Sequence, residues 1–146
     1  MSVTPQNYRS EIRRIIEKRV KALWVDTGNV PLTAIAWQDV PFVPPTNVAW
    51  LKVNILFGDS TELTIGQVGL NKNYGSLQLQ IFVPKGQGAG AQLDALAGKA
   101  RTIFSRFSGN DLYCGASRAG TDFIDGAWLG TPITTSFQVQ EFITAV

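Results

Sequence analysis

The residues with the most evident chemical potential are the glycines of the segment Gly86-Gln87-Gly88-Ala89-Gly90-Ala91. A strand-like run, residues 77–83, precedes them, and a helix-like run follows at once. A strand, a G-x-G-x-x-[G/A] turn and a helix form the outline of a dinucleotide-binding site, in which the start of the helix holds a pyrophosphate. This spacing makes nucleotide binding the first hypothesis.

The surroundings of the glycines argue against a nucleotide. The preceding strand has a polar face of Ser76, Gln78 and Gln80, whereas a strand in a doubly wound sheet is apolar on both faces. Pro84-Lys85 separates the strand from the first glycine, and no Gly-Lys-[Ser/Thr] follows, as a Walker loop requires. We therefore expect no cofactor, and we interpret the segment as a hinge between strand and helix. Its residues are Pro84, Gly86, Gly88 and Gly90.

Other residues suited to catalysis or metal binding are scarce. The sequence has no histidine, which removes the commonest general base and most zinc sites. The single cysteine, Cys114, has no second thiol as a partner, and we expect a small core residue there. Asp122, Asp125 and Glu141 do not have a spacing that demands a carboxylate site, so we interpret them as loop and surface acids. We expect no metal and no enzymatic activity.

Positive charge gathers near the N-terminus. Six basic residues and two acidic ones give this segment a charge of +4, although the whole chain has only +2. A basic face of Arg13, Arg14, Lys18 and Lys21 could grip a nucleic-acid backbone, which leaves a DNA-binding module as one hypothesis. Solvation or a subunit contact explains the same pattern.

The basic residues lie on a predicted amphipathic helix. Thr4 as N-cap and Pro5 at the first helical position predict its start, and apolar residues at three- and four-residue steps continue to about Trp24. Residues 26–29 predict a closing turn. A second apolar stripe predicts a helix over residues 93–107, in which Gly98 costs about 1 kcal/mol relative to alanine. Close packing of that helix on a sheet would be a reason to keep Gly98.

Alternating runs predict the strands. Three prolines make residues 40–46 an extended connector, and residues 58–60 predict a turn that leads into a hairpin. The predicted strands are 34–38, 48–57, 62–65, 77–83, 112–116 and 132–143. The order, roughly α-β-β-β-β-α-β-β, predicts an α+β fold in which two helices pack on one face of a mainly antiparallel, mixed sheet. We expect one domain spanning residues 1–146.

The composition bears on location and partners. No apolar run is long enough to cross a membrane, no secretory signal is evident, and we expect assembly in a cytoplasm. Only 16% of the residues are charged and four are tryptophan, which fits a surface buried in an assembly and equally a weakly charged monomer.

The middle of the chain resembles a known family. Trp50-Leu51-Lys52-Val53, the run from Gly75 to Gly88 that ends Phe-Val-Pro-Lys-Gly-Gln-Gly, and a helix ending Ile103-Phe104 are similar to the tail terminator-like proteins of long-tailed bacteriophages. The similar part is about residues 48–107. The resemblance implies a structural virion protein: a homohexameric ring on the head-proximal end of the tail tube. Such a ring stops tube polymerisation and meets head-completion proteins, and DNA passes through its lumen.

Two long predicted loops, residues 67–74 and 108–130, are the candidate contacts with other subunits or the tube. The candidate interface residues are Asn71, Lys72, Asn73, Tyr74, Arg118, Asp122 and Trp128. Beside the resemblance, a head-completion or neck protein of the same virion is one alternative. The residues themselves leave a DNA-binding module and a nucleotide-dependent enzyme as further alternatives.

Overall fold

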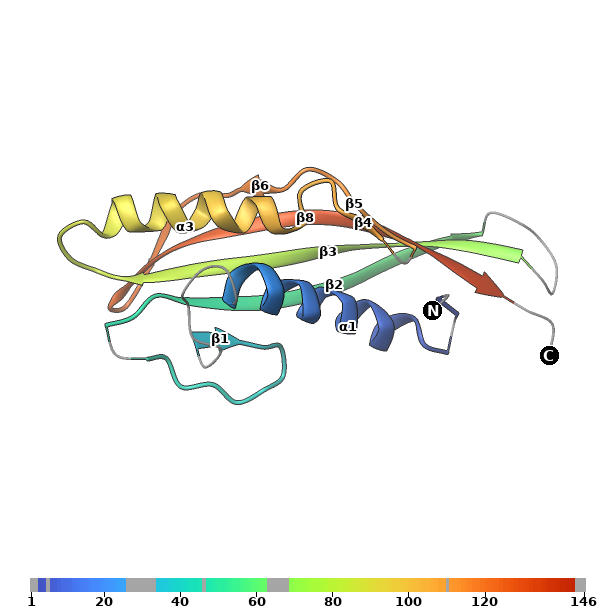
Figure 1. Cartoon of the computed structure of the whole chain (residues 1–146), viewed down its shortest axis with the longest axis horizontal. Helices are drawn as coiled ribbons and strands as arrows, with labels where there is room; N and C mark the ends of the chain where they lie inside the picture. Colours follow the sequence, from blue (N-terminus) through green and yellow to red (C-terminus); the bar gives the residue numbers. More distant parts are fainter. Residues whose placement is uncertain are drawn as a thin grey trace.

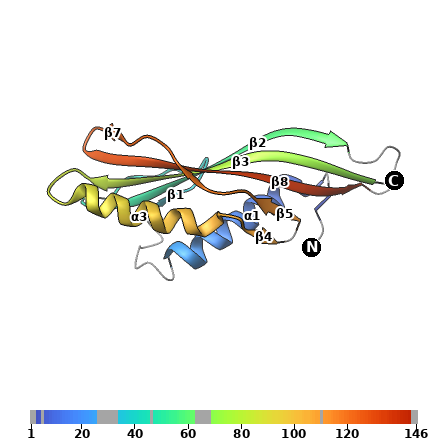
Figure 2. The same cartoon turned by 90° about the horizontal axis from the view of Figure 1, so that it is seen from above.

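The computed structural model describes residues 3–4, 6–25, 34–45, 47–62, 69–109 and 111–143. In this part of the chain, two α-helices lie on one face of a mixed eight-stranded sheet, which confirms the α+β prediction (Figure 1; Figure 2). The elements are α1 (Tyr8–Val20), the π-helical turn η1 (Lys21–Val25), β1 (Ile35–Ala36), β2 (Trp50–Glu62), β3 (Gly69–Pro84), α3 (Ala89–Phe104), β4 (Ser108–Gly109), β5 (Leu112–Cys114), β6 (Arg118–Ala119), β7 (Phe123–Asp125) and β8 (Trp128–Ile143). The strand order is β1-β2-β3-β8-β5-β4, and β6 and β7 also pair with β8.

The hydrophobic core lies between the helices and the sheet. Side chains alternate between the two faces of a strand, so every second residue of the long strands faces the helices. These residues are almost fully buried, and they include Leu51 and Val53 of β2 and Leu79 and Ile81 of β3. Gln78 and Gln80 lie on the opposite face and are only half-buried, as their alternation with apolar residues predicted.

Three strands are longer than the sequence pattern predicted. β3 pairs with β8 from Gly69↔Ile143 to Pro84↔Trp128, and the ends of these strands extend beyond the helices (Figure 1). The predicted turn at residues 58–60 is wrong, because β2 continues through it with a register shift between Phe57 and Ser60. The predicted loop at residues 67–74 is wrong from Gly69 onward, where β3 begins. Residues 63–68 lie outside the described part.

The segment after α3, predicted as a long loop with one strand at residues 112–116, contains several short strands. Four two- or three-residue strands, β4 to β7, run along the chain from Ser108 to Asp125, and β8 begins at Trp128. Three of them, β5, β6 and β7, pair in turn along β8. β5 confirms the strand predicted at residues 112–116, although it ends at Cys114. The other three are too short for alternation to predict them: β4 is defined by its pairing with β5, and β6 and β7 are defined by their pairing with β8.

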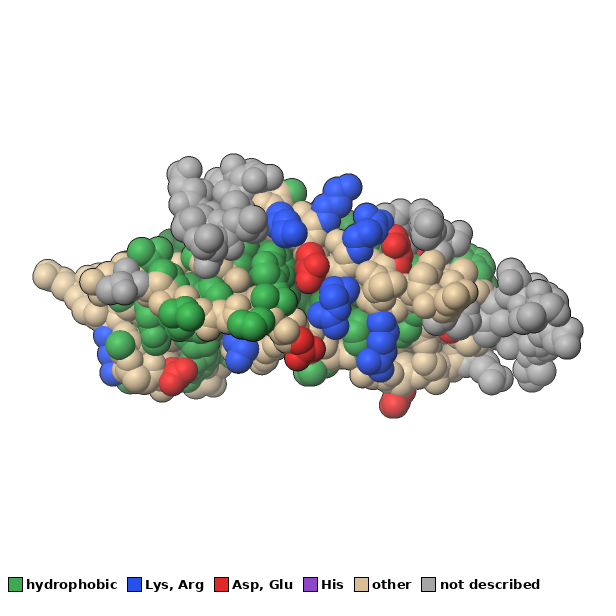
Figure 3. Space-filling model, turned by 90° about the horizontal axis from the view of Figure 1, so that it is seen from below, with side chains coloured by type: hydrophobic (Ala, Val, Ile, Leu, Met, Phe, Trp, Pro, Cys, Tyr) green, Lys and Arg blue, Asp and Glu red, His purple; other side chains and the backbone are tan. Residues whose placement is uncertain are grey.

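The described part of the connector before β2, residues 40–45, contains no strand, as its prolines predicted. β1 is only two residues long and pairs parallel to β2. The segment 40–45 then crosses one end of the sheet without regular pairing. Val40 and Val43 are 54% and 86% exposed there, and hydrophobic side chains gather at this end of the face seen in Figure 3.

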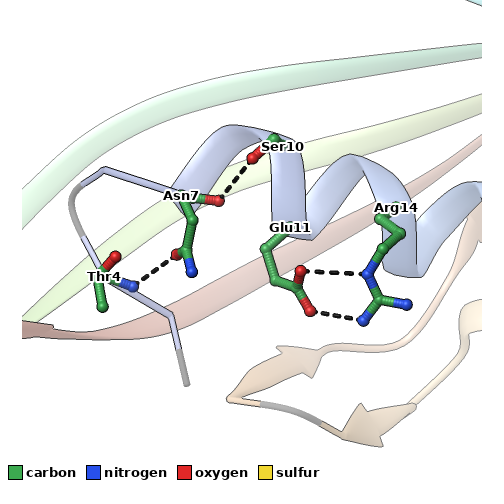
Figure 4. Close-up of polar contacts among 5 residues, drawn as sticks. All are labelled: Thr4, Asn7, Ser10, Glu11 and Arg14. Carbon is green, nitrogen blue, oxygen red and sulfur yellow. Dashed lines mark hydrogen bonds and ion pairs between the residues drawn. The ribbon is translucent and has the colours of Figure 1, made fainter. Parts of the chain in front are cut away.

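The start of α1 differs from its prediction. The helix begins at Tyr8 with Asn7 in the N-cap position, so Thr4 is not the cap. Instead the Thr4 N–H donates to Asn7 Oδ1 at 2.7 Å (Figure 4). Contacts with the sheet explain why the helix does not begin at Thr4. The Phe142 N–H donates to the Val3 carbonyl oxygen at 2.8 Å, and Val3 is fully buried. The predicted Pro5 position and the turn at residues 26–29 lie outside the described part.

Helix α3 begins at Ala89 and ends at Phe104, earlier at both ends than predicted. Gly98 does not pack closely on the sheet: it is exposed, and a Cβ added there would meet no atom within 4 Å. The expectation that close packing on the sheet explains Gly98 is therefore wrong.

Gly98→Ala is expected to stabilise the protein by about 0.5–1 kcal/mol, because it lowers the entropy of the unfolded chain and fills open space. The midpoint of urea unfolding measures the change. Gly88→Ala is the matched control, since Gly88 has a φ of +81° and alanine there should destabilise. Equal shifts in the two variants would contradict the expectation.

Candidate assembly surfaces

The glycine hinge turns the chain from β3 into α3. Gly86 has a φ of +149° and Gly88 a φ of +81°, both in the region that favours glycine. The Ala89 N–H donates to the Gly86 carbonyl oxygen at 3.2 Å, so the turn itself uses this amide of the first helical turn. Pro84 ends β3, and Gly90 lies inside α3 with open space around it. The four hinge residues thus lie at one corner of the fold, and only two of them have a positive φ.

The candidate interface residues do not form one surface. Asn71 to Tyr74 lie near the start of β3, opposite the end of β8, whereas Trp128 begins β8 and pairs with Pro84. An extended strand places these two ends of β8 roughly 40 Å apart. Arg118 and Asp122 are exposed and lie on β6 and just before β7. The set therefore covers at least two separate regions of the molecule.

The sequence predicts Asn73 as an interface residue, but Asn73 lies inside the fold. It is 2% exposed and hydrogen-bonds through its Oδ1 with the Ser60 hydroxyl. Asn71 donates to Glu141 Oε1 at 3.3 Å, and Glu141 is also buried. These polar pairs occupy the helix-facing side of β3 near its start. Tyr74 faces the other way and is 40% exposed, which leaves it available for a contact.

Trp128 belongs to a second, smaller apolar cluster on the face of the sheet opposite the helices. At its centre the Trp50 ring stacks on Phe82 with centroids 4.0 Å apart. Phe42 and Trp128 lie 5.1 and 5.9 Å from Trp50, and Phe123 lies 5.5 Å from Phe82. Trp128 is half-buried in this cluster, so its first role is packing. The cluster anchors both the 40–45 connector, through Phe42, and β7, through Phe123.

The basic side chains of α1 divide into groups with different partners. Arg13 Nη1 donates to Gln38 Oε1 at 3.1 Å, and the same oxygen accepts the Ile55 N–H at 3.0 Å, so Arg13 supports the edge of β2. Lys18 and Lys21 are exposed, and Figure 3 shows basic side chains along the middle of this face. The predicted basic face is thus partly committed to contacts within the chain.

Arg14 forms an ion pair with Glu11. Arg14 Nη2 and Nε donate to the two carboxylate oxygens at 2.6 and 3.1 Å (Figure 4). These hydrogen bonds hold the pKa of Glu11 below its usual value, in spite of its burial. Glu11 is therefore ionised at neutral pH and neutralises part of the basic helix.

Arg19 contacts the core instead of solvent. Its Nε donates to the Ile103 carbonyl oxygen at 2.5 Å, and its guanidinium lies 3.9 Å from the centroid of the Phe107 ring. Burial lowers the pKa of Arg19, although arginine stays charged under ordinary conditions. This residue joins α1 to the end of α3. The spacing of charges along the helix does not predict this contact, because the partner of Arg19 lies 84 positions away in the sequence.

Cys114 lies beside the core, in a shallow depression with Tyr74 and Tyr113. Burial raises the pKa of its thiol to about 11. At pH 8 we expect the folded protein to react with a thiol reagent at least about tenfold more slowly than the urea-unfolded chain, because little thiolate is present. Absorbance during reaction with a disulfide reagent measures both rates, and the folded rate should rise as the pH approaches 11. A folded rate equal to the unfolded one would contradict this expectation.

Acidic residues do not converge on a metal-type site. Asp125 pairs with Trp128 at one end of β8, and Glu141 lies near the other end. Among the described residues, no three of His, Cys, Asp or Glu are grouped as metal ligands would be. None of the described helices is both long and apolar enough to span a membrane.

The fold places the chain in the α+β class, with one long, partly twisted sheet and two helices on a single face. The family model for the phage tail terminator protein matches residues 11–137, and the chain belongs to that family. This confirms the resemblance found in residues 48–107. The family is one of structural virion proteins of bacteriophage tails.

Solved structures agree on the fold. One solved chain is 18% identical, with a TM-score of 0.61, over 87% of this chain and 94% of that one. At this level of identity the similarity supports the fold alone. A search of curated proteins gives no match.

Proposed function

We propose that copies of this chain close into a ring, a homohexamer, on the head-proximal end of a phage tail tube. The ring ends polymerisation of the tube and gives the head-completion protein a surface to join. DNA passes through its lumen. The match of the tail terminator family model over residues 11–137 is the observation that carries this proposal.

The surface of the chain suits such a role. A closed ring of identical subunits needs two different patches on each subunit, one for each neighbour. Exposed apolar residues occur in separate places: Val43 and Ile124 are 86% and 68% exposed at one end of the sheet, while Leu56 and Tyr74 are 57% and 40% exposed farther along it. Groups of exposed apolar residues on a small protein favour contacts with other chains.

The experiment is a measurement of mass with and without tail tubes. Sedimentation of the purified protein, alone and mixed with tubes made from the tube protein, is expected to show a species of about six times 15.9 kDa. Electron microscopy should then show a cap at one end of each tube, and capped tubes should no longer elongate when tube protein is added.

Two outcomes would contradict the proposal. One is a strict monomer that never associates with tubes. The other is a protein that binds only the head portal or neck and leaves tube growth unchanged, which would make it a head-completion protein.

A further inference from the structure

An open groove runs between the C-terminal half of α1 and Phe107, the third residue after α3. Ile15, Leu23 and Phe107 contribute apolar surface to it, and Arg14 and Lys18 line it from α1. No acidic side chain is among the described residues that line the groove, but Arg14 is paired with Glu11, so the cation left to meet a new acid is Lys18. The groove therefore offers an apolar floor beside one positive charge, which fits a segment with an exposed apolar side chain and an acid near it.

The groove has a firm wall. Phe107 packs against Phe104 with ring centroids 6.3 Å apart, and the Arg19 guanidinium covers its ring at 3.9 Å. The Phe107 carbonyl oxygen also accepts the Cys114 N–H at 2.8 Å. A preformed wall lowers the entropy cost of binding. Lys18, on the opposite side, has no ion-pair partner in the described part of the chain and is free to meet an acid.

The hairpin formed by β7 and β8 has the complementary pattern. Ile124 is 68% exposed, and it lies between Asp122 and Asp125, which are both exposed. Phe123 packs into the aromatic cluster against Phe82, which fixes the turn to the sheet while Ile124 remains in solvent. Gly126, with a φ of +58°, closes the turn. Ile124 pairs with Leu129 and Asp125 pairs with Trp128, so these two neighbouring side chains point to opposite faces of the hairpin. Ile124 is thus an exposed apolar side chain whose acidic neighbour on its side is Asp122, two residues before it.

This hairpin cannot reach the groove of its own chain. Ser108, next to Phe107, pairs with Tyr113, and Tyr113 pairs with Gln138, whereas the turn is at Trp128. The two features are therefore separated by roughly 30 Å along β8. They are different patches on one subunit, as a head-to-tail contact between identical subunits requires.

We propose that the groove lined by Lys18 and Phe107 receives the β7–β8 hairpin of the next copy of the chain, with Ile124 on the apolar floor and Asp122 beside Lys18. This inference rests on the proposed ring and identifies the contact that repeats around it. Opposite charges at this contact orient the subunits, and the buried isoleucine supplies the apolar area.

The experiment is a charge exchange, with sedimentation equilibrium as the measurement of association. Ile124→Ser and Lys18→Glu are each expected to weaken association at least about tenfold. Asp122→Lys should weaken it similarly, and adding Lys18→Glu to Asp122→Lys should recover at least part of the loss. Lys52→Glu and Asp59→Lys, at exposed positions away from both patches, are the matched controls and should leave association unchanged.

The outcomes separate this inference from the ring itself. If the wild type assembles and caps tubes, while the variants at Ile124 and Lys18 assemble equally well, this contact is wrong and the ring stands. If the wild type remains a monomer with tubes present, both proposals fail. If Lys18→Glu abolishes salt-sensitive binding of duplex DNA and leaves assembly unchanged, the groove is a phosphate site and the subunit contact is overturned. Circular dichroism melts of the variants should match the wild type, because the altered side chains are exposed.

Discussion

Trp50→Ala is expected to lower the free energy of unfolding by about 3–5 kcal/mol, the usual cost of removing a large buried aromatic side chain. Trp50 is only 8% exposed and is the centre of the second apolar cluster, where it contacts Phe42, Phe82 and Trp128. Its removal leaves a cavity that the sheet cannot close. It also frees the 40–45 connector, since Phe42 is the aromatic anchor of that segment.

Urea unfolding, followed by far-UV circular dichroism, measures the change, and limited proteolysis tests whether the connector becomes accessible. Trp50→Phe is the matched control. It keeps an aromatic ring in the stack, and it loses no hydrogen bond because Trp50 Nε1 is buried without a partner among the described residues. We expect it to cost less than half as much as alanine. A Trp50→Ala variant within about 1 kcal/mol of wild type would show that the cluster does not act as a core.

Gly75→Val is expected to destabilise the protein by about 3 kcal/mol or more, because there is no room for a side chain. A Cβ at Gly75 would lie 2.5 Å from Cζ of Phe137 and 2.6 Å from the Leu56 carbonyl oxygen. The first contact is with a ring that can shift. The second is with backbone held in the β2–β3 ladder, which cannot move without breaking pairs on both sides.

The same unfolding measurement tests Gly75→Val, with Gly115→Ala as control. At Gly115 the nearest atom to an added Cβ is 3.7 Å away, an ordinary contact, so its effect should be small. Combining Gly75→Val with Phe137→Leu should recover only part of the loss, because the clash with the Leu56 carbonyl remains. Full recovery would assign the whole effect to the ring, and no loss in Gly75→Val would contradict the close approach.

The fold could be predicted where hydrophobic periodicity was strong. Alternation identified the second half of β3, most of β2 and most of β8, and a helical stripe identified α1 and α3. The first half of β3 has Asn71, Asn73 and Gly75, which are typical of loops. Its strand structure depends on partners distant in sequence, namely Ser60 and Glu141, which accommodate those polar side chains. No local pattern contains that information.

The candidate surfaces were less predictable than the fold. The family resemblance and the basic helix were evident from the sequence, but the partners of the charges were not. Arg13 meets Gln38 and Arg19 meets the end of α3 only after the chain has folded. Trp128 and Asn73 lie in stretches whose composition is typical of loops, yet both have packing roles inside the chain. The exposed Ile124 between two acids is readable from the sequence once β7 is known to be a strand.

The position of β8 has a consequence for the order of events during synthesis. It pairs with β3, β5, β6 and β7, and it follows all of them along the chain. A nascent chain that has not yet released β8 from the ribosome can pair β1, β2 and β3, but it lacks the strand that joins β3 to β5, β6 and β7. Completion of the sheet is thereby coupled to synthesis of the last strand, and a truncated translation product has only separate parts of the sheet.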